Sequence, residues 1–347
     1  MSPYKVLIVD DSALMRELLT EILNSDPALH VIGTAGDPYA ARDKIKALDP
    51  DVLTLDIEMP RMDGLNFLEK LMRGHPMPVV MISSLTDKGA DTTLRALTLG
   101  AVDYVSKPKI DVSNGTLEQW QEIVSKVKAA ASVKVRVSGG YKNPPPELAS
   151  VPYHFAATHK VVAIGASTGG TEALKDLLSP LPPDFPGVVI VQHMPETYTR
   201  QFAQRLDSLC RIRVHEAKDG DAILPGHALL APGGHHMTVA RRGAEYAVHV
   251  YRGERVNRHQ PSVDVLFSSC AQQLGRNALG VILTGMGSDG ARGLLEMKQA
   301  DAFTIAQDEA TSVVFGMPKE AILLGAADQV LPLGKIPAAL QQRLAAK

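Results

Sequence analysis

Cysteine is nearly absent from this chain of 347 residues, which contains only Cys210 and Cys270, and their spacing fits no metal-binding pattern. This scarcity disfavours a disulfide framework and predicts two free thiols in a reducing compartment. The chain also lacks an excess of charge of one sign, because its net charge is −2. It therefore has no electrostatic footprint for nucleic acid or an anionic membrane. No apolar run approaches the roughly 20 residues that span a bilayer. The amino terminus shows no signal-peptide pattern, so we expect a cytoplasmic protein that neither binds nucleic acid nor inserts into a membrane.

The length and pattern of the chain predict two α/β domains joined by a linker. A chain of 347 residues, 45% of them hydrophobic, can bury two ordinary cores. In residues 1–131 short β-branched runs alternate with amphipathic stretches, which is typical of βα units, and the last helix is expected at about Thr116 to Ala131. Residues 132–157 lose this periodicity and contain Pro144-Pro145-Pro146, so we predict a linker there. The alternation resumes in residues 158–347, the second predicted domain.

Carboxylates, a hydroxyl and a lysine follow strand-like runs of the first domain. The groups at these strand ends are Asp10, Asp11, Asp56, Ser83 and Lys107. Because the carboxyl ends of parallel strands meet at one edge of a sheet, we expect these groups to lie together. A single aspartate at a strand end is more often a turn or helix cap. Suitable groups at four strand ends in order nevertheless favour a shared site.

The chemistry of this cluster is that of a phospho-acceptor. Clustered carboxylates repel one another unless a cation joins them, and oxygen ligands suit Mg²⁺. An ionised Asp56 beside the metal can attack a phosphoryl group and form an aspartyl phosphate. Lys107 would neutralise the phosphoryl charge, and the Ser83 hydroxyl would donate a hydrogen bond to a phosphoryl oxygen.

These groups and the segment D-I-E-M-P-R-M-D-G-L around Asp56 resemble the receiver domain of response regulators, over residues 1 to about 125. The resemblance implies a flavodoxin-like (βα)5 fold, phosphorylation at Asp56 and metal binding by Asp10 and Asp11. It also implies that Glu58 supplies a backbone carbonyl to the metal.

Two further expectations come from the same resemblance. Tyr104 matches the aromatic residue that turns inward on phosphorylation, although by itself it could be ordinary core or surface filling. The Lys107–Pro108 peptide bond is expected to be cis.

The second domain opens with a candidate nucleophile turn. Gly165-Ala166-Ser167-Thr168-Gly169 follows the strand-like run Val161–Ile164 and matches G-x-S-x-G, a strand-to-helix turn that presents a serine. The small flanking residues permit a tight turn, and the N-terminus of the following helix stabilises developing negative charge. A Gly/Ser-rich turn can equally cradle a phosphate or a nucleotide.

The turn presents a nucleophile, rather than binding a phosphate or nucleotide, only if a base and a carboxylate lie near Ser167. Ser167 needs a nearby base, and that base needs an orienting carboxylate. The buried-type strand Val188–Gln192 ends at His193, and the strand Gly280–Leu283 opens into a glycine-rich loop with Asp289. Taken alone, such a histidine is more often structural and such an aspartate more often a helix cap. Three strand ends that present Ser, His and Asp together favour a catalytic triad.

The second domain resembles the catalytic domain of the chemotaxis protein-glutamate methylesterases, the CheB family. The matching segments span residues 160 to about 335 and read I-G-A-S-T-G-G, V-I-V-Q-H-M-P, L-A-P-G-G-H-H-M, P-S-V-D-V-L-F, L-T-G-M-G-S-D-G and A-Q-D-E-A-T-S-V-V-F-G-M-P. The resemblance implies a doubly wound, mainly parallel α/β domain. It implies Ser167 as nucleophile, His193 as general base and acid, and Asp289 as the orienting carboxylate. The backbone N–H groups of Met286 and Thr168 would form the oxyanion hole.

By the same resemblance, the enzyme is activated by phosphorylation and hydrolyses glutamate γ-methyl esters on the cytoplasmic helices of methyl-accepting chemoreceptors. It releases glutamate and methanol, and it also deamidates receptor glutamines. A chemotaxis histidine kinase would donate the phosphoryl group. The esterase is expected to need no cofactor, and the chain is expected to act as a monomer.

Two other function classes lack their own sequence signals. A receiver fused to a DNA-binding output would carry a basic helix-turn-helix, and none appears. A nucleotide-binding fold would carry a P-loop lysine, which the turn around Ser167 does not have. His259, beside Arg258, is expected to be a polar residue at the surface or at the rim of the cleft.

Overall fold

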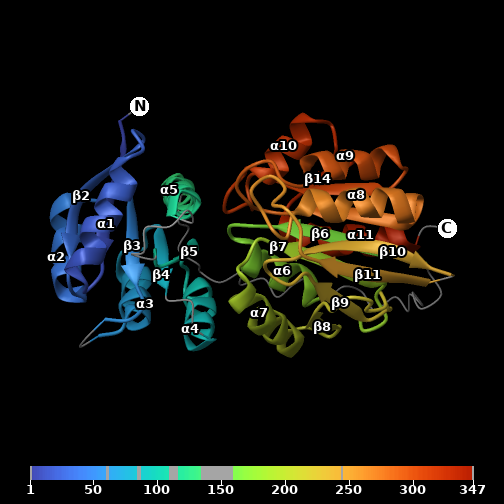
Figure 1. Cartoon of the computed structure of the whole chain (residues 1–347), viewed down its shortest axis with the longest axis horizontal. Coiled ribbons are helices and arrows are strands. Elements are labelled where there is room, and N and C mark those ends of the chain that lie inside the picture. Colours follow the sequence, from blue (N-terminus) through green and yellow to red (C-terminus); the bar gives the residue numbers. More distant parts are fainter. Residues whose placement is uncertain are drawn as a thin grey trace. The chain divides into compact units, whose positions relative to one another are not determined.

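The computed structural model describes residues 2–59, 62–83, 87–108, 116–133, 159–243 and 245–345. The chain divides into two compact units, Met1–Tyr141 and Lys142–Lys347, which can be followed by colour in Figure 1. Nearly all of the predicted linker lies outside the described residues. Both cysteines are free, as predicted. No helix in the described ranges is long and apolar enough to cross a bilayer.

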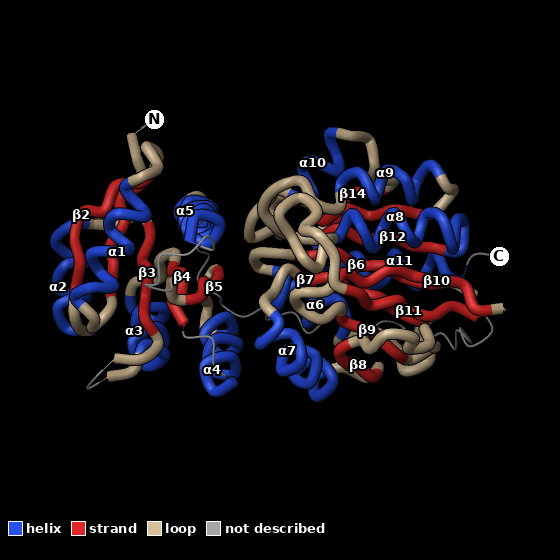
Figure 2. The backbone as a smooth tube through the Cα atoms, viewed as in Figure 1, coloured by secondary structure: helices blue, strands red, loops and turns tan. Residues whose placement is uncertain are grey.

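The N-terminal unit is a five-stranded parallel sheet with the strand order β2-β1-β3-β4-β5. Its strands are β1 (Tyr4–Val9), β2 (Leu29–Ala35), β3 (Val52–Asp56), β4 (Val79–Ser83) and β5 (Asp103–Ser106). Its helices are α1 (Ala13–Asn24), α2 (Pro38–Leu48), α3 (Gly64–Gly74), α4 (Asp87–Thr98) and α5 (Thr116–Ala131). A helix follows each strand, as Figure 2 shows, so the expected flavodoxin-like (βα)5 fold is confirmed.

Strand residues and an amphipathic helix pair form the core of this unit. Helices α1 and α5 contact each other, and with β1 they bury an apolar cluster that includes Val6, Ile8, Leu19, Ile22 and Val127. Helix α1 begins after Ser12, whose hydroxyl accepts a hydrogen bond from the Met15 N–H. The short connection between β1 and this cap holds Asp10 and Asp11 at the carboxyl edge of the sheet.

The C-terminal unit is a seven-stranded parallel sheet with the order β14-β13-β12-β6-β7-β9-β8, accompanied by an antiparallel hairpin of β10 and β11. Its strands are β6 (Val161–Ala166), β7 (Gly187–Gln192), β8 (Arg213–Glu216), β9 (His227–Leu230), β10 (His236–Arg242), β11 (Glu245–Tyr251), β12 (Ala278–Ile282), β13 (Phe303–Gln307) and β14 (Gln329–Leu331). Its α-helices are α6 (Gly170–Leu178), α7 (Glu196–Leu209), α8 (Val263–Leu274), α9 (Ala291–Gln299), α10 (Met317–Leu323) and α11 (Ile336–Ala345). Two 3₁₀ turns, η2 (Gly275–Asn277) and η3 (Leu333–Lys335), complete the unit.

Both faces of this sheet are buried, as a doubly wound fold requires. One face packs with α8 and α9 in a core that includes Val161, Ala163, Val191, Phe267 and Leu294. Successive side chains of a strand point to opposite faces, so the equally buried Val162 and Ile164 face away from that core. Helix α6, which follows β6, contacts α7 and α11. The predicted doubly wound, mainly parallel domain is therefore confirmed.

The order of the strands places a topological switch beside β6. The chain adds β7, β9 and β8 on one side of β6 and later adds β12, β13 and β14 on the other. Open α/β sheets bind ligands at such a switch, outside the carboxyl ends of the strands. The candidate nucleophile turn follows β6 at that edge.

Candidate active site and phosphorylation site

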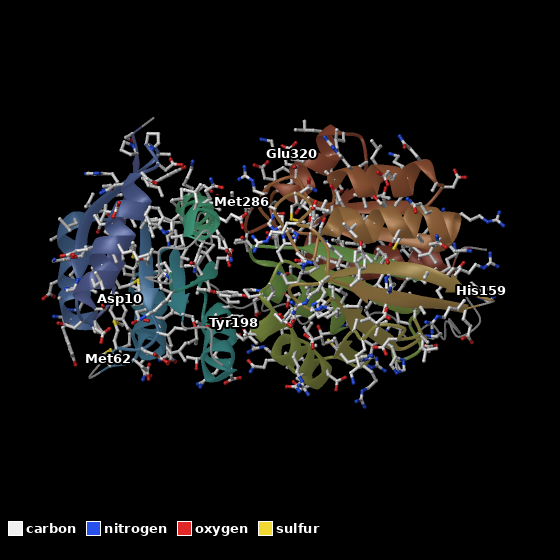
Figure 3. The ribbon with its side chains drawn as sticks, viewed as in Figure 1. Asp10, Met62, His159, Tyr198, Met286 and Glu320 are labelled. Atoms are coloured by element: carbon white, nitrogen blue, oxygen red, sulfur yellow. The ribbon has the colours of Figure 1, made fainter. Side chains whose placement is uncertain are left out.

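The acidic cluster of the N-terminal unit forms at the carboxyl edge of its sheet. Asp10, labelled in Figure 3, and Asp56 are fully buried, whereas Asp11 is exposed. Carboxylate oxygens of the three residues lie within 4.8 Å of one another. Lys107 Nζ lies 2.8 Å from Asp56 Oδ2 and 3.6 Å from Asp10 Oδ2. The structure therefore brings together four of the groups that the sequence places at strand ends.

Burial has the largest effect on the pKa values of the two buried carboxyls, Asp10 and Asp56. It raises the pKa of Asp56 to about 6 against the opposing hydrogen bond from Lys107, and the charge of Asp10 adds to the rise. Burial also raises the pKa of Asp10, again against Lys107. Asp10 Oδ2 is buried and accepts no hydrogen bond from the described residues. A small divalent cation would supply both the missing positive charge and a bond to this oxygen, so the donor set fits one.

Ser83 and Glu58 lie close to the phospho-acceptor position. Ser83 ends β4, is buried, and its hydroxyl accepts a hydrogen bond from Thr93 Oγ1 at 2.9 Å. The Glu58 N–H donates to Asp56 Oδ1 at 3.3 Å, which fixes the start of the loop after β3. The expected roles of Ser83 and Glu58 toward a phosphoryl group and a metal stay predictions.

The structure contradicts the expected cis peptide bond, whereas the switching role of Tyr104 stays a prediction. Tyr104 lies in β5 with 4% of its surface exposed, and Lys126 Nζ is 4.9 Å from the centre of its ring. Its side chain is thus in an inward position in this structure.

The cis peptide bond of the described residues is Gln260–Pro261, so the expectation of a cis Lys107–Pro108 bond is wrong.

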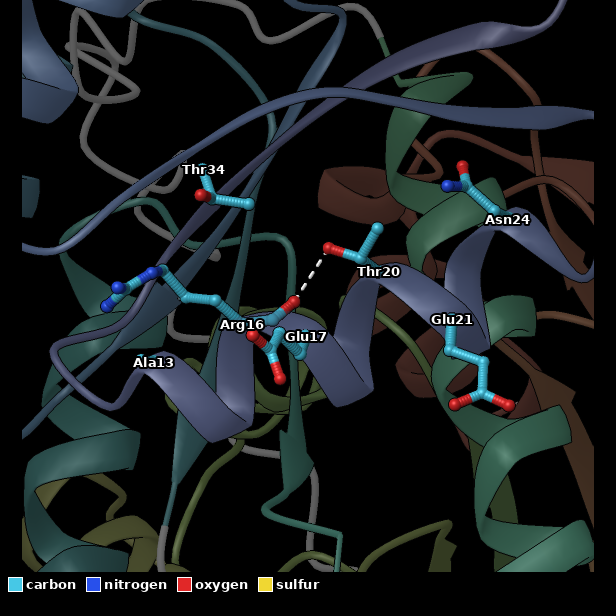
Figure 4. Close-up of a pocket in the computed structure, with 7 residues that line it drawn as sticks. All are labelled: Ala13, Arg16, Glu17, Thr20, Glu21, Asn24 and Thr34. Carbon is cyan, nitrogen blue, oxygen red and sulfur yellow. Dashed lines mark hydrogen bonds between the residues drawn. The ribbon is translucent and has the colours of Figure 1, made fainter.

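A surface hollow of the N-terminal unit does not coincide with this cluster. It is lined by residues of α1 and by Thr34 of β2, as Figure 4 shows. The hydrogen bond drawn there runs within α1, from the Thr20 hydroxyl to the Arg16 carbonyl at 2.6 Å. Arg16 Nη1 also donates to the Asp10 carbonyl at 2.7 Å. Arg16 therefore holds the turn after β1, and the residues that line the hollow include no member of the acidic cluster.

Ser167 lies in the tight turn between β6 and α6. Its N–H donates to the Thr284 carbonyl at 3.0 Å, and its carbonyl accepts from the Gly170 N–H at 2.7 Å. Gly169 adopts a φ of 76°, and a Cβ there would lie 2.5 Å from the Cβ of Val313. The turn is thus tied to the loop after β12, with Ser167 half-buried.

His193 and Asp289 come from the two strands that flank β6. Strands β7 and β12 both pair with β6 in parallel, so their carboxyl ends share its edge. His193 follows β7 directly, and its N–H donates to the Ala166 carbonyl at 3.1 Å. His193 Nε2 lies 2.8 Å from Asp289 Oδ2, and the two side chains are 8% and 1% exposed. A buried imidazole–carboxylate pair therefore lies beside the serine turn.

The Asp289 carboxylate is held by several donors. Besides His193 it accepts hydrogen bonds from Val263 N at 2.6 Å, Asn257 Nδ2 at 2.7 Å, Ser262 Oγ at 2.7 Å and Asp264 N at 3.3 Å. Burial disfavours its charged form, but the hydrogen bond and charge of His193 oppose this, together with hydrogen bonds from Asn257 and Ser262. The net effect holds the pKa of Asp289 well below its usual range.

The His193 ring has a defined orientation. A carboxylate can only accept hydrogen bonds, so the Nε2 that faces Asp289 carries the proton. Nδ1 then holds the lone pair, and it is buried without a hydrogen-bond partner among the described residues. The serine-protease triad uses the two nitrogens the other way round. No hydrogen bond joins Ser167 Oγ to His193 within the described residues, and such bonds often form only once substrate is bound.

The loop after β12 presents a backbone donor beside the serine. Met286, labelled in Figure 3, is half-buried, and no hydrogen bond within the described residues takes up its N–H. Gly285 before it packs so closely that a Cβ there would lie 2.7 Å from Ser167 Cβ. Thr168 is 4% exposed, and its carbonyl accepts from Thr284 Oγ1 at 2.9 Å. The Met286 N–H is therefore a backbone donor beside Ser167, as an oxyanion hole requires, and the role expected of Thr168 stays a prediction.

Sequence reasoning did not single out the residues that support this pair. Gln192 Nε2 donates to the Ser167 carbonyl at 2.9 Å and to the His193 carbonyl at 3.2 Å. Ser262 lies in the segment P-S-V-D-V-L-F and caps α8, and a serine before an apolar helical run is a sequence signal for such a cap. His259, expected at the surface or cleft rim, is partly exposed and stacks on His193 with ring centres 3.7 Å apart.

Comparison with known proteins assigns both units. The family model for the CheB methylesterase matches residues 162–340, and that for the response regulator receiver domain matches residues 6–114. A protein-glutamate methylesterase/protein-glutamine glutaminase 1 from Geobacter metallireducens is 59% identical over 342 residues, covering 96% of this chain and 94% of that protein. A protein of the same activity name from Bordetella parapertussis is 57% identical over 345 residues, covering 99% and 98%.

A solved structure agrees for the C-terminal unit. The CheB methylesterase catalytic domain of Thermotoga maritima matches with a TM-score of 0.52 and 40% identity, covering 53% of this chain and 98% of that one. The matched family models together cover both compact units. The chain therefore belongs to the CheB methylesterase family and carries a response regulator receiver domain in its N-terminal unit.

Proposed function

We propose that this chain is a phosphorylation-controlled protein-glutamate methylesterase that also deamidates protein glutamines. The observation that carries this proposal is the convergence of Ser167, His193 and Asp289 at the carboxyl ends of three adjacent strands, in a chain of this family. The names of the relatives state the same two activities. The substrates are glutamate γ-methyl esters and glutamine amides on the cytoplasmic helices of chemoreceptors.

The hydrolase chemistry follows from the orientation of the pair. Ser167 Oγ attacks the ester carbonyl carbon while His193 Nδ1 accepts the hydroxyl proton, and Asp289 stabilises the imidazolium through Nε2. The N–H groups of Met286 and Thr168 hold the tetrahedral oxyanion. His193 then returns the proton to the leaving methoxide, and methanol departs. With a glutamine substrate the leaving group is ammonia.

A second half-reaction restores the enzyme. Water attacks the acyl-enzyme carbonyl, and His193 Nδ1 takes the proton that this water loses. The tetrahedral intermediate collapses and the proton on His193 returns to Ser167 Oγ. The glutamate side chain is released as a carboxylic acid that loses its remaining proton to solvent. Because Asp289 has a strongly lowered pKa, it stays ionised throughout and does not take part in proton transfer.

The receiver half supplies the switch. A carboxylate oxygen of Asp56 attacks the phosphorus of a phosphohistidine on the donor, which we propose is a chemotaxis histidine kinase. The N–P bond breaks, the kinase histidine leaves, and Asp56 becomes an aspartyl phosphate. Asp10, Asp11 and Asp56, with the Glu58 carbonyl, would hold a Mg²⁺ ion, which neutralises charge on the transferring phosphoryl group when bound. Lys107 pairs with the phosphoryl oxygens, and the Ser83 hydroxyl donates to one of them.

Methanol release from membranes that contain methylated chemoreceptors tests the hydrolase. Ser167→Ala should abolish release, because the acyl-enzyme of the proposed mechanism forms on the Ser167 hydroxyl. Ser208→Ala is a matched control, since Ser208 is an exposed serine of α7 that bonds only to the Arg205 carbonyl. Methanol release by Ser167→Ala close to the wild-type rate would refute the nucleophile assignment.

A further inference from the structure

The segment between β11 and α8 contains a strained turn. Val256 and His259 exchange two backbone hydrogen bonds, of 3.1 and 2.8 Å, so they close a two-residue loop, here called the Val256–His259 turn. Its central residues Asn257 and Arg258 have φ values of 52° and 70°. A turn of this kind requires positive φ at both positions, which suits asparagine but is unfavourable for arginine. Strained backbone of this kind persists where its surroundings fix it and is concentrated at functional sites.

Asn257 connects the turn to the carboxylate of the proposed triad. Its Nδ2 donates to Asp289 Oδ1 and to Asp264 Oδ2, both at 2.7 Å. Asp264 in turn accepts from the Gly293 N–H at 2.7 Å at the start of α9. The amide thus bridges the two carboxylates and holds Asp289 at Oδ1, whereas His193 contacts Oδ2.

His259, two residues later, covers the base. Its ring lies face to face with the His193 ring, with centres 3.7 Å apart and planes inclined by 9°. The hydrogen bond to Asp289 holds His193 at Nε2 alone, and a single bond permits the ring to tilt about that contact. A parallel ring in van der Waals contact opposes the tilt and shields one face of the imidazole from water.

We propose that the Val256–His259 turn is a positioning device for the hydrolase, in which Asn257 fixes the Asp289 carboxylate and His259 fixes the plane of the His193 ring. The inference rests on the proposed function, because it assumes that His193 exchanges a proton with Ser167. His259 acts through His193 and needs no contact with substrate. A ring held in one plane keeps Nδ1 in line for each proton transfer, and small misplacements of a catalytic group cost large factors in rate.

Kinetics of the full-length chain on methylated receptor membranes test the device. His259→Ala should lower kcat by about 10- to 100-fold and leave KM nearly unchanged, because the loss affects proton transfer rather than binding. His259→Phe should recover kcat to within about threefold of wild type, since phenylalanine restores a flat ring without a titratable nitrogen. Asn257→Gly keeps the left-handed backbone, removes the amide, and should lower kcat about tenfold.

A control and a substrate-independent readout separate the possible results. His249→Ala removes an exposed histidine of β11 that stacks on Tyr251 at 5.2 Å, and it should leave kcat unchanged. A sulfonyl fluoride that labels Ser167 reports the reactivity of the nucleophile without receptor, and its rate should fall in His259→Ala and recover in His259→Phe. The inference is wrong if His259→Ala keeps kcat within twofold, if KM alone rises, or if His259→Phe is as slow as His259→Ala. Wild-type labelling of Ser167 without methanol release would instead contradict the proposed substrate and leave the labelling test of the turn valid.

Discussion

Among single residues, Asp289 is the centre of the hydrogen-bond network around His193. All of its hydrogen-bond partners are donors: His193, Asn257, Ser262, and the N–H groups of Val263 and Asp264. An ionised carboxylate satisfies all of them, because it only accepts hydrogen bonds. The same network fixes which nitrogen of His193 is protonated, and so which nitrogen is the base in the proposed mechanism.

Replacing Asp289 with Asn tests this network. The amide NH₂ would face donors, and His193 would lose its acceptor at Nε2 and favour the wrong tautomer. The equivalent change in a serine protease lowers kcat by about 10⁴, and we expect a loss of about 10³ or more here, with about 1–3 kcal/mol of lost stability. Methanol release and urea unfolding measure the two effects. Asp301→Asn, at an exposed site, is the control, and a loss of activity below tenfold in Asp289→Asn would show that another carboxylate orients His193.

Asp56 makes the stability of the receiver unit depend on pH. Its pKa is raised to about 6 by burial, above the value of about 3.9 in an unfolded chain. Between these values the folded state binds more protons than the unfolded state, so the free energy of unfolding falls as the pH rises through this window. In metal-free buffer Asp56→Asn should therefore be more stable than wild type at pH 8, by about 1–2 kcal/mol after solvent screening, and equally stable near pH 4.

The chain provides its own probe for that measurement. Trp120 is the single tryptophan and packs against the core of the N-terminal unit, so its fluorescence during urea unfolding reports on the receiver alone. Asp43→Asn, which removes an exposed carboxylate beside Arg42, is the control and should show no such pH dependence. A stability difference for Asp56→Asn that is the same at pH 4 and pH 8 would contradict the raised pKa.

At the scale of elements, the carboxyl ends of β12, β6 and β7 position the hydrolase groups. The sequence predicted these strands because their β-branched runs are continuous, and it predicted α5 with the bounds that the structure shows. It could also place Ser167, His193 and Asp289 at one sheet edge, because each directly follows such a strand or lies in the loop after it. This reasoning needs only local pattern and the geometry of parallel sheets.

The supporting residues could not be predicted in the same way. Asn257 and His259 lie in a turn outside any regular element, and their contacts depend on how β11 leads into α8. The choice of nitrogen at His193 depends on the direction from which Asp289 approaches. Such features follow from tertiary packing, which a local pattern does not contain.

Gly285 tests how tightly the loop after β12 packs on the serine turn. A Cβ there would clash with Met317 Sδ and would lie 2.7 Å from Ser167 Cβ and 3.1 Å from Ser167 N. The Met317 side chain can move aside, but the contact with Ser167 remains, so Gly285→Ala should displace the serine turn. We expect at least a tenfold loss of kcat and a matching loss of Ser167 labelling by a sulfonyl fluoride. Gly334→Ala is the control, because a Cβ there meets nothing within 4 Å. Wild-type kcat in Gly285→Ala would mean that the loop yields without affecting the site.

At the scale of the whole molecule, two units with different chemistries lie on one chain. Tethering keeps the receiver at high effective concentration near the hydrolase, so weak contacts suffice for control. Phosphorylation would replace the Asp56 carboxylate with an acyl phosphate that carries a charge of about −1.5 to −2, at the buried edge beside Lys107. A change of about 1.4 kcal/mol in how the receiver interacts with the hydrolase shifts the population tenfold.

Removing the receiver tests whether it inhibits. A fragment that starts near Ala149 should demethylate receptors faster than the unphosphorylated full-length chain, and phosphodonors should not change its rate. Methanol release by both proteins at equal concentration measures this, with circular dichroism to verify that the fragment is folded. A folded fragment that is no faster would show that the receiver activates by a positive contribution instead of by blocking access.

We propose that phosphorylation of Asp56 controls hydrolysis at Ser167. The direct measurement is the initial rate of methanol release from methylated receptor membranes, with and without acetyl phosphate and Mg²⁺, for wild type, Asp56→Asn and Ser167→Ala. We predict that the phosphodonor accelerates wild type, leaves Asp56→Asn at its basal rate, and produces no methanol with Ser167→Ala. Acceleration of Asp56→Asn to the wild-type level, or methanol from Ser167→Ala, would contradict the account.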